Sequence, residues 1–168
     1  FFAGFVAFLY APMVVLLVFS FNESDIPSFP LTGFTVRWYR EFLANAELLA
    51  ALRTSALVAA CSSLVTVTLG TCASVALVRR RIPGRSALTG LLLSPLVIPY
   101  VVFGISLLML FQTLAVPLSI ATVVVAHVVL SLPYTILVLV PRLEQISITL
   151  EEAAHDLGAG GFRTFRSI

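Results

Sequence analysis

Lysine is absent from this chain, and all ten basic residues are arginines. A Walker A motif needs a lysine to reach the phosphates of ATP, so the chain builds no P-loop ATP site of its own. Charged residues make up 11% of the 168 residues and hydrophobic residues 60%, which excludes a soluble domain. The net charge of +2 is too small to indicate a nucleic-acid partner.

Cysteine is also scarce. Cys61 and Cys72 are separated by eleven positions in one predicted helix, which is about 16 Å along the helix axis. At that distance they form no disulfide, so they are read as small apolar side chains that indicate no redox compartment. The sequence starts at Phe1 without a methionine and stops at Ile168. We therefore expect a fragment at both ends.

Long stretches without charge predict an all-α, polytopic membrane protein. A bilayer is crossed by roughly 20 apolar residues, and we expect spans at about 1–22, 54–78, 86–112 and 118–140. The 56 uncharged residues 86–141 would reach about 84 Å as one helix, so the chain turns back near 112–119. A signal peptide is the alternative for 1–22, but that stretch lacks a basic n-region and a cleavage site, which favours a retained span.

The loop 79–85, RRRIPGR, holds four arginines and no acidic residue. Such a loop is typical of the cytoplasmic side, and two crossings later the segment 141–168 returns to that side. On the other side, apolar residues from Thr35 onward predict one interfacial helix with a face formed by Trp38, Phe42, Ala46 and Leu49. This helix either packs against the spans, which we favour, or forms a platform for a substrate-binding protein.

Inside the predicted spans, proline and glycine at Pro95, Pro99 and Gly104 predict a kink or local unwinding. Unwound backbone at membrane depth points to a translocation path, although a purely structural kink is an equal alternative. His127 has no acidic or second histidine partner in the spans, so a neutral histidine bonded to a neighbouring helix is favoured over a proton relay. Two ladders of small residues predict close helix packing: Ser55, Ala59, Ser63, and Thr66, Gly70, Ser74.

The polar C-terminal segment 149–168 predicts a helix–turn–helix hairpin. Thr149 and Glu152 have the spacing of a capping box, and an apolar face of Leu150, Ala153, Ala154 and Leu157 follows. The glycines at 158, 160 and 161 end this helix. A second apolar stripe then starts, formed by Phe162, Phe165 and Ile168.

The sequence Glu152-Ala153-Ala154, with Gly158 and then Ile168, resembles the EAA loop of ABC-transporter permeases. Other stretches support the resemblance over nearly the whole chain: Ser20-Phe21-Asn22, Gly33-Phe34-Thr35 with Trp38-Tyr39, Arg81-Ile82-Pro83-Gly84-Arg85, and Ser131-Leu132-Pro133. Together they are most similar to the second permease of spermidine/putrescine-type importers. The resemblance implies the fold of a type I ABC importer permease, truncated here before its last spans.

The resemblance further implies a bacterial inner-membrane subunit that transports polyamines or a related small solute. Its partners would be an ABC ATPase dimer, a second permease, an extracytoplasmic substrate-binding protein and the lipid bilayer. The EAA loop, 149–168, would dock on the ATPase through Glu152, Ala153, Ala154, Asp156 and Gly158. The substrate path itself is not assigned to residues.

No constellation of residues predicts an enzyme, a cofactor site or a metal site. Glu151 and Glu152 are adjacent and diverge by about 100° on a helix, and Glu151 with His155 is at most a weak surface pair. The alternative function is a gradient-driven secondary transporter or channel fragment, which has no reason to display an EAA-like hairpin. An intramembrane enzyme is a remote third alternative.

Overall fold

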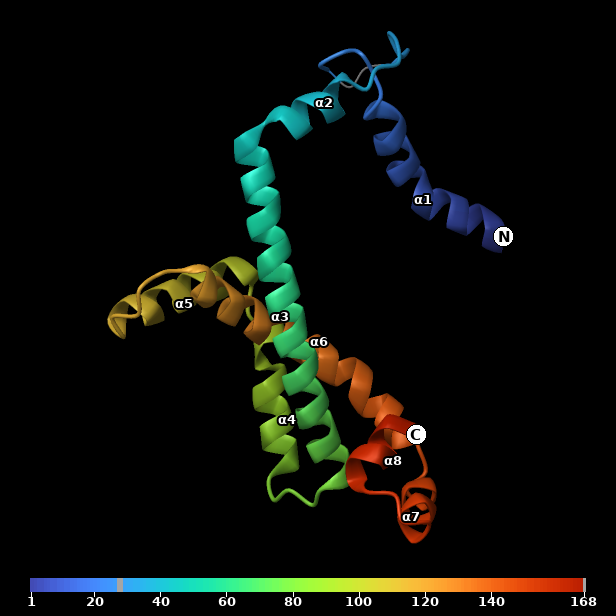
Figure 1. Ribbon diagram of the computed structural model, residues 1–168, viewed down its shortest axis with the longest axis vertical. Helices are drawn as coiled ribbons and strands as arrows, with labels where there is room; N and C mark the ends of the chain where they lie inside the picture. Colours follow the sequence, from blue (N-terminus) through green and yellow to red (C-terminus); the bar gives the residue numbers. More distant parts are fainter. Residues whose placement is uncertain (27–28, 168) are drawn as a thin grey trace. The chain divides into compact units, whose positions relative to one another are not determined.

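The computed structural model describes residues 1–26 and 29–167, and this part of the chain contains helices and no strand (Figure 1). The all-α fold class is confirmed. The chain divides into two compact units, 1–56 and 57–168, with the boundary inside one long helix. The helices are α1 (Phe2–Phe19), α2 (Arg37–Ala44), α3 (Ala46–Arg79), α4 (Arg85–Leu93), the 3₁₀ helix η1 (Ser94–Val97), α5 (Tyr100–Thr113), α6 (Ile120–Gln145), α7 (Ile148–Asp156) and α8 (Gly161–Ser167).

Three of these helices, α1, α3 and α6, are long and apolar enough to cross a bilayer. The pair formed by α4–η1 and α5 provides a fourth crossing if it counts as one bent span. Helix α1 contains Pro12, and none of its residues is buried within the chain. Its apolar surface is therefore available to lipid or to other helices.

The connection after α1 is organised around one buried asparagine. The Asn22 side chain accepts hydrogen bonds from the backbone N–H and the hydroxyl of Thr32, at 3.3 and 3.2 Å. The Trp38 indole N–H donates to the Asn22 carbonyl at 2.8 Å, and an isolated antiparallel bridge joins Asn22 to Phe34. These contacts bring together the motif residues of 20–22 and 33–39 in unit 1.

The prediction of one interfacial helix after Thr35 is wrong, since two helices occupy this stretch. Helix α2 ends at Ala44, Asn45 is extended, and α3 begins at Ala46, so Ala46 and Leu49 do not share a helix with Trp38. The physical reason is Asn45, whose side-chain oxygen accepts the backbone N–H of Leu48 at 3.0 Å. An asparagine that caps the first turn of a new helix ends the previous one.

In unit 2, α3 carries a buried ladder of small polar residues at four-residue spacing: Ser62, Thr66, Gly70 and Ser74. The second predicted ladder is therefore buried, while the first, Ser55, Ala59 and Ser63, is exposed within this chain. At Gly70 the backbone passes so close to α6 that an added Cβ would lie 2.5 Å from Thr135 Cγ2. Only glycine allows this approach.

The stretch 85–113 is a broken helix with a bend of 107° between Arg85–Val97 and Tyr100–Thr113 (Figure 1). The break lies at Ile98, which is extended, and Pro99, which is not helical and has a ψ of 132°. Proline supplies no backbone N–H and disfavours a helical residue before it, which explains the position of the break. Gly104, which was expected to contribute, lies inside the regular helix α5.

After α5 the chain turns at 114–119 and enters α6. The Thr122 hydroxyl accepts the backbone N–H of Ser119 at 3.0 Å and so satisfies one donor at the start of α6. Helix α6 continues through Pro133 and Pro141 to Gln145. One short connection then leads to the C-terminal hairpin.

Candidate functional site

The C-terminal hairpin consists of α7 and α8, joined at 157–160. The predicted capping box is wrong, because the residue that caps α7 is Ser147, whose hydroxyl accepts the backbone N–H of Thr149 at 3.3 Å. Thr149 lies within the first turn, so Glu152 is in the middle of the helix and does not cap it. The helix begins earlier than predicted because a serine was available one turn before the apolar stripe.

The end of α7 is a Schellman motif. The backbone N–H of Gly158 donates to the His155 carbonyl at 2.9 Å, and the N–H of Ala159 donates to the Ala154 carbonyl at 2.9 Å. Gly158 has a φ of +81°, a left-handed conformation that costs glycine nothing. The sharp turn predicted at Gly158 is thus present.

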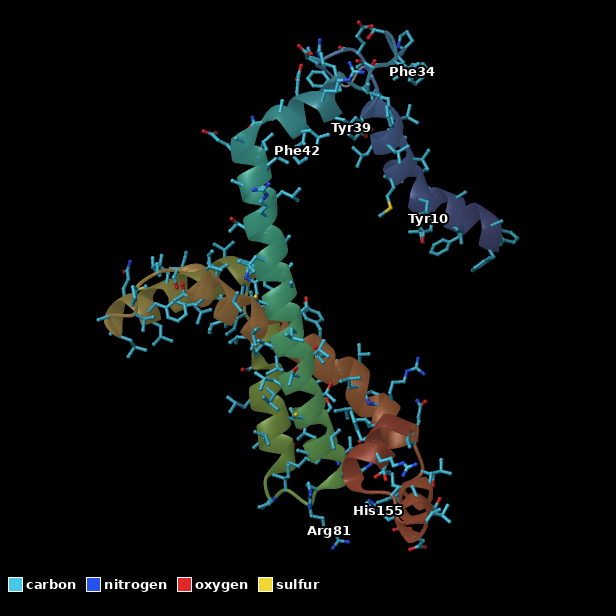
Figure 2. The ribbon with its side chains drawn as sticks, viewed as in Figure 1. Tyr10, Phe34, Tyr39, Phe42, Arg81 and His155 are labelled. Atoms are coloured by element: carbon cyan, nitrogen blue, oxygen red, sulfur yellow. The ribbon has the colours of Figure 1, made fainter. Side chains whose placement is uncertain are left out.

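The proposed coupling residues fall on two sides of α7. Glu152, Ala153 and Asp156 are exposed, whereas Ala154 is half-buried beside Glu151. Leu150 and Leu157, which are 56% and 89% exposed, lie on the same side as Ala153. This exposed apolar side is the part of α7 that a partner protein could contact. Figure 2 shows His155 on the same helix.

The start of α8 is fixed by Thr164, which is 5% exposed. Its backbone N–H and its hydroxyl both donate to the Gly160 carbonyl, at 3.0 and 3.3 Å. Of the predicted second apolar stripe, Phe165 is 55% exposed. Ile168 and the Phe162 side chain lie outside the described part of the chain.

One arginine anchors the hairpin to the rest of unit 2. Arg79, the last residue of α3, donates from Nε to a Glu151 carboxylate oxygen at 2.7 Å. Its Nη2 contacts the same carboxylate and also donates to the Ile146 carbonyl, at 3.3 Å, where α6 ends. The two charged side chains are 16% and 29% exposed, so water screens this pair only in part. The anchor joins α3, the end of α6 and α7.

A second ion pair lies nearby. Arg85, the first residue of α4, donates to Glu144 near the end of α6 at 2.8 Å, with both side chains about half exposed. Sequence reasoning missed both pairs. It treated Arg79 and Arg85 only as part of a basic loop, which includes Arg81 between α3 and α4 (Figure 2). The sequence signal that could have found these pairs is the number of membrane crossings, which places the basic loop and the hairpin on the same side of the membrane.

The polar residues inside the long apolar stretch are also placed by the structure. The predicted bond from His127 to a neighbouring helix is not found among the described residues, where its Nδ1 lies 2.8 Å from the Val123 carbonyl of its own helix, α6. Its side chain is exposed within this chain. In unit 2 the hydroxyls of Tyr100 and Tyr134 lie 2.5 Å apart, close to the break at Pro99.

In unit 1 the aromatic residues of the connection surround a groove of about 530 Å³. Tyr39 and Phe42, both on α2 (Figure 2), contribute to its lining together with Asp25 and Trp38. The Asp25 carboxylate is paired with Arg37 at 2.7 Å, and the Arg37 guanidinium lies 4.3 Å from the centre of the Trp38 ring. Arg37 thus already pairs with both Asp25 and Trp38 in this groove.

Among the described residues, no three His, Cys, Asp or Glu side chains are arranged to hold a metal ion. The site therefore consists of a surface hairpin, its arginine anchor and a set of neutral polar groups on the spans.

The chain matches no family model. It is 38% identical over 165 residues to the putrescine transport system permease protein PotI of Escherichia coli, covering 94% of this chain and 58% of PotI. It is 35% identical to the spermidine/putrescine transport system permease protein PotC of Escherichia coli, covering 96% of this chain and 61% of PotC. The chain thus spans about three fifths of the length of these relatives.

A more distant match is the molybdate/tungstate transport system permease protein WtpB of Thermococcus kodakarensis. It is 35% identical over 118 residues, which cover 70% of this chain and 47% of WtpB. The names of these relatives agree on a permease and differ in what is transported. They confirm the resemblance that the sequence motifs predicted.

Proposed function

Since the chain is homologous to permease proteins of bacterial transport systems, we propose that it is the membrane-spanning permease subunit of a bacterial ABC importer. Its cargo is a polyamine such as putrescine or spermidine. The observation that carries this proposal is the identity of 38% and 35% to the two polyamine permeases over at least 94% of the chain. The match to WtpB is shorter, at 70% of the chain.

In this proposal the chain lies in the bacterial cytoplasmic membrane and forms half of the translocation path. A second permease forms the other half, and an extracytoplasmic substrate-binding protein delivers the cargo. Two separate ATPase subunits hydrolyse ATP, which agrees with the absence of a lysine for a P-loop from the 168 residues of this sequence.

The α7–α8 hairpin is the coupling element. Ala153 contacts the ATPase within the exposed apolar side of α7, and the half-buried Ala154 beside it keeps this side low enough to enter a groove on the partner. Glu152 and Asp156 are exposed and can pair with basic residues of the partner. Gly158 supports the proposal through its left-handed turn, which sets the direction of α8.

Arg79 transmits movement from the hairpin to the spans. When the ATPase dimer closes and displaces α7, the Glu151 carboxylate pulls on the guanidinium at the end of α3. The Ile146 carbonyl, bonded to the same guanidinium, moves with it. A part-buried, charge-assisted ion pair holds its geometry more firmly than an exposed one, which supports the transmission of movement through this contact.

The test is a crosslink in membranes that contain the full-length protein and its candidate ATPase. Cys61 and Cys72 are exposed and are first replaced by serine. A single cysteine in the Ala153→Cys variant is then expected to crosslink to the ATPase, with a yield that changes when ATP is added. The matched control is Leu43→Cys on α2, which is 66% exposed but lies in unit 1.

Crosslinking at Ala153 and not at Leu43 supports the coupling role. An intact, membrane-inserted protein that gives no ATPase crosslink at either position would contradict the proposal and favour a gradient-driven transporter. Uptake of labelled putrescine by the same membranes tests the cargo separately from the coupling.

A further inference from the structure

A polar stripe runs along α6 within a stretch that is otherwise apolar. His127, Ser131 and Tyr134 follow each other at i, i+4 and i+7, and all three side chains are exposed within this chain. On a helix these positions lie within about 60° of one another. We name these three residues and Tyr100 the acceptor stripe.

The hydrogen bonds of the acceptor stripe leave acceptor atoms available. A carbonyl oxygen can only accept, so His127 Nδ1 carries the hydrogen toward Val123, and Nε2 is the ring nitrogen left for another hydrogen bond. The hydroxyls of Tyr100 and Tyr134 bond each other at 2.5 Å, which uses one O–H and leaves lone pairs on both oxygens. Tyr100 and Tyr134 are 60% and 49% exposed.

These groups lie too deep in the membrane to face lipid at low cost. Tyr134 precedes Arg142 by eight residues and His127 precedes it by fifteen, which corresponds to about 12 and 22 Å along a helix. The hydrocarbon core is about 30 Å thick, and acceptor atoms left without a partner there are costly. Polar side chains at such depth face the protein interior or a watery cavity.

The stripe is adjacent to the break in the preceding span. Tyr100 is the first residue of α5, directly after the non-helical Pro99, and the two halves of that span meet at 107°. Irregular backbone at membrane depth is tolerated where it lines a water-filled path. The Tyr100–Tyr134 bond joins this break to α6.

We propose that the acceptor stripe lines the cargo path and binds ammonium groups of the cargo, an inference that rests on the proposed function. All its polar groups can accept hydrogen bonds from an ammonium group, and the tyrosine rings attract cations through their faces. The stretch 86–141 contains no arginine or lysine that would recognise an oxyanion. It also contains no carboxylate, so a cation passes without being held by a fixed negative charge.

The test measures water access and cargo contact at single cysteines in the full-length protein with its partner subunits. In a background without Cys61 and Cys72, the variants His127→Cys, Ser131→Cys and Tyr134→Cys are labelled with a membrane-impermeant thiol reagent that carries a quaternary ammonium group. The matched control is Val125→Cys on the opposite side of α6, where the native side chain is 48% exposed. Labelling is repeated with putrescine present.

The expected result is labelling at the stripe about tenfold faster than at Val125, with putrescine slowing the stripe positions alone. Labelling no faster than at Val125 would overturn the proposal, since lipid, a second permease or a further span would then cover the stripe. Fast labelling that putrescine does not slow would overturn the assignment of the cargo. Crosslinking of Ala153 to the ATPase is independent of both results, so a failure here is distinguishable from a failure of the proposed function.

A conservative variant tests a hydroxyl of the acceptor stripe without leaving a cavity or introducing a cysteine. Tyr100→Phe keeps the ring and removes the oxygen that accepts from the cargo, so the KM for putrescine uptake is expected to rise about tenfold. The matched control is Tyr10→Phe on α1, where the native side chain is 58% exposed, and it is expected to leave uptake unchanged. An unchanged KM in Tyr100→Phe would remove this hydroxyl from the binding site.

Discussion

Glu151→Gln removes the charge that Arg79 holds and leaves the shape of α7 unchanged. The wild-type carboxylate accepts from Arg79 Nε at 2.7 Å and also contacts Nη2. A hydrogen bond between charged groups contributes about 1.5 to 3 kcal/mol net. Since the two side chains are 16% and 29% exposed, we expect the loss to be about 1 to 2 kcal/mol.

This loss should appear as more frequent local opening of α7 and not as global unfolding. A change of about 1 to 2 kcal/mol makes the open state roughly 5 to 30 times more populated. Hydrogen exchange of the full-length protein in a lipid mimic measures this directly. The amides of 148–156 are expected to exchange faster in Glu151→Gln by that factor.

Glu152→Gln is the matched control because it removes the same charge from the next residue. Glu152 is exposed, and no ion pair to it is found among the described residues. Its exchange should match the wild type in 148–156. Equal exchange in the two variants would refute the reasoning, because the anchor would then contribute nothing that an exposed carboxylate does not.

Two further predictions concern glycines. Gly158→Ala places a side chain at a φ of +81°, which should destabilise the turn by about 1 kcal/mol. Cargo-stimulated ATPase activity of the assembled transporter is therefore expected to fall. The control Gly160→Ala, where an added Cβ meets nothing within 4 Å, should not lower this activity. Gly70→Ala creates a contact of 2.5 Å with Thr135 and should destabilise the chain by about 1 to 3 kcal/mol in an unfolding titration. Gly90 is a helical glycine with open space around it, so Gly90→Ala should leave stability unchanged or raise it slightly. An equal loss of stability in both variants would show that close packing at Gly70 is not the cause.

The helices and their apolar character could be predicted because long uncharged stretches leave little choice. Backbone groups in hydrocarbon must bond within their own segment, so each apolar run becomes a helix. The break at Pro99 was also readable, since proline acts through its own covalent structure and needs no distant partner.

Helix boundaries could not be read as well, because single polar side chains decide them. Asn45 starts α3 and ends α2, although the apolar pattern runs on through both. Ser147 caps α7 although Thr149 has the better capping-box spacing. Several residues within one turn could cap a helix, and the choice depends on the direction from which the chain arrives.

The ion pair between Arg79 and Glu151 could not be predicted from the sequence for a different reason. Arg79 and Glu151 are separated by 72 positions in the sequence, and the basic loop offers several arginines of equal charge. What selects Arg79 is its place as the last residue of α3, since the helix fixes where its side chain emerges. The ladder on α3 sets that place in turn, because the close approach at Gly70 determines how α3 and α6 cross. A substitution at Gly70 should therefore weaken the anchor as well as the packing, and exchange at 148–156 in Gly70→Ala should rise although no residue of the anchor has changed.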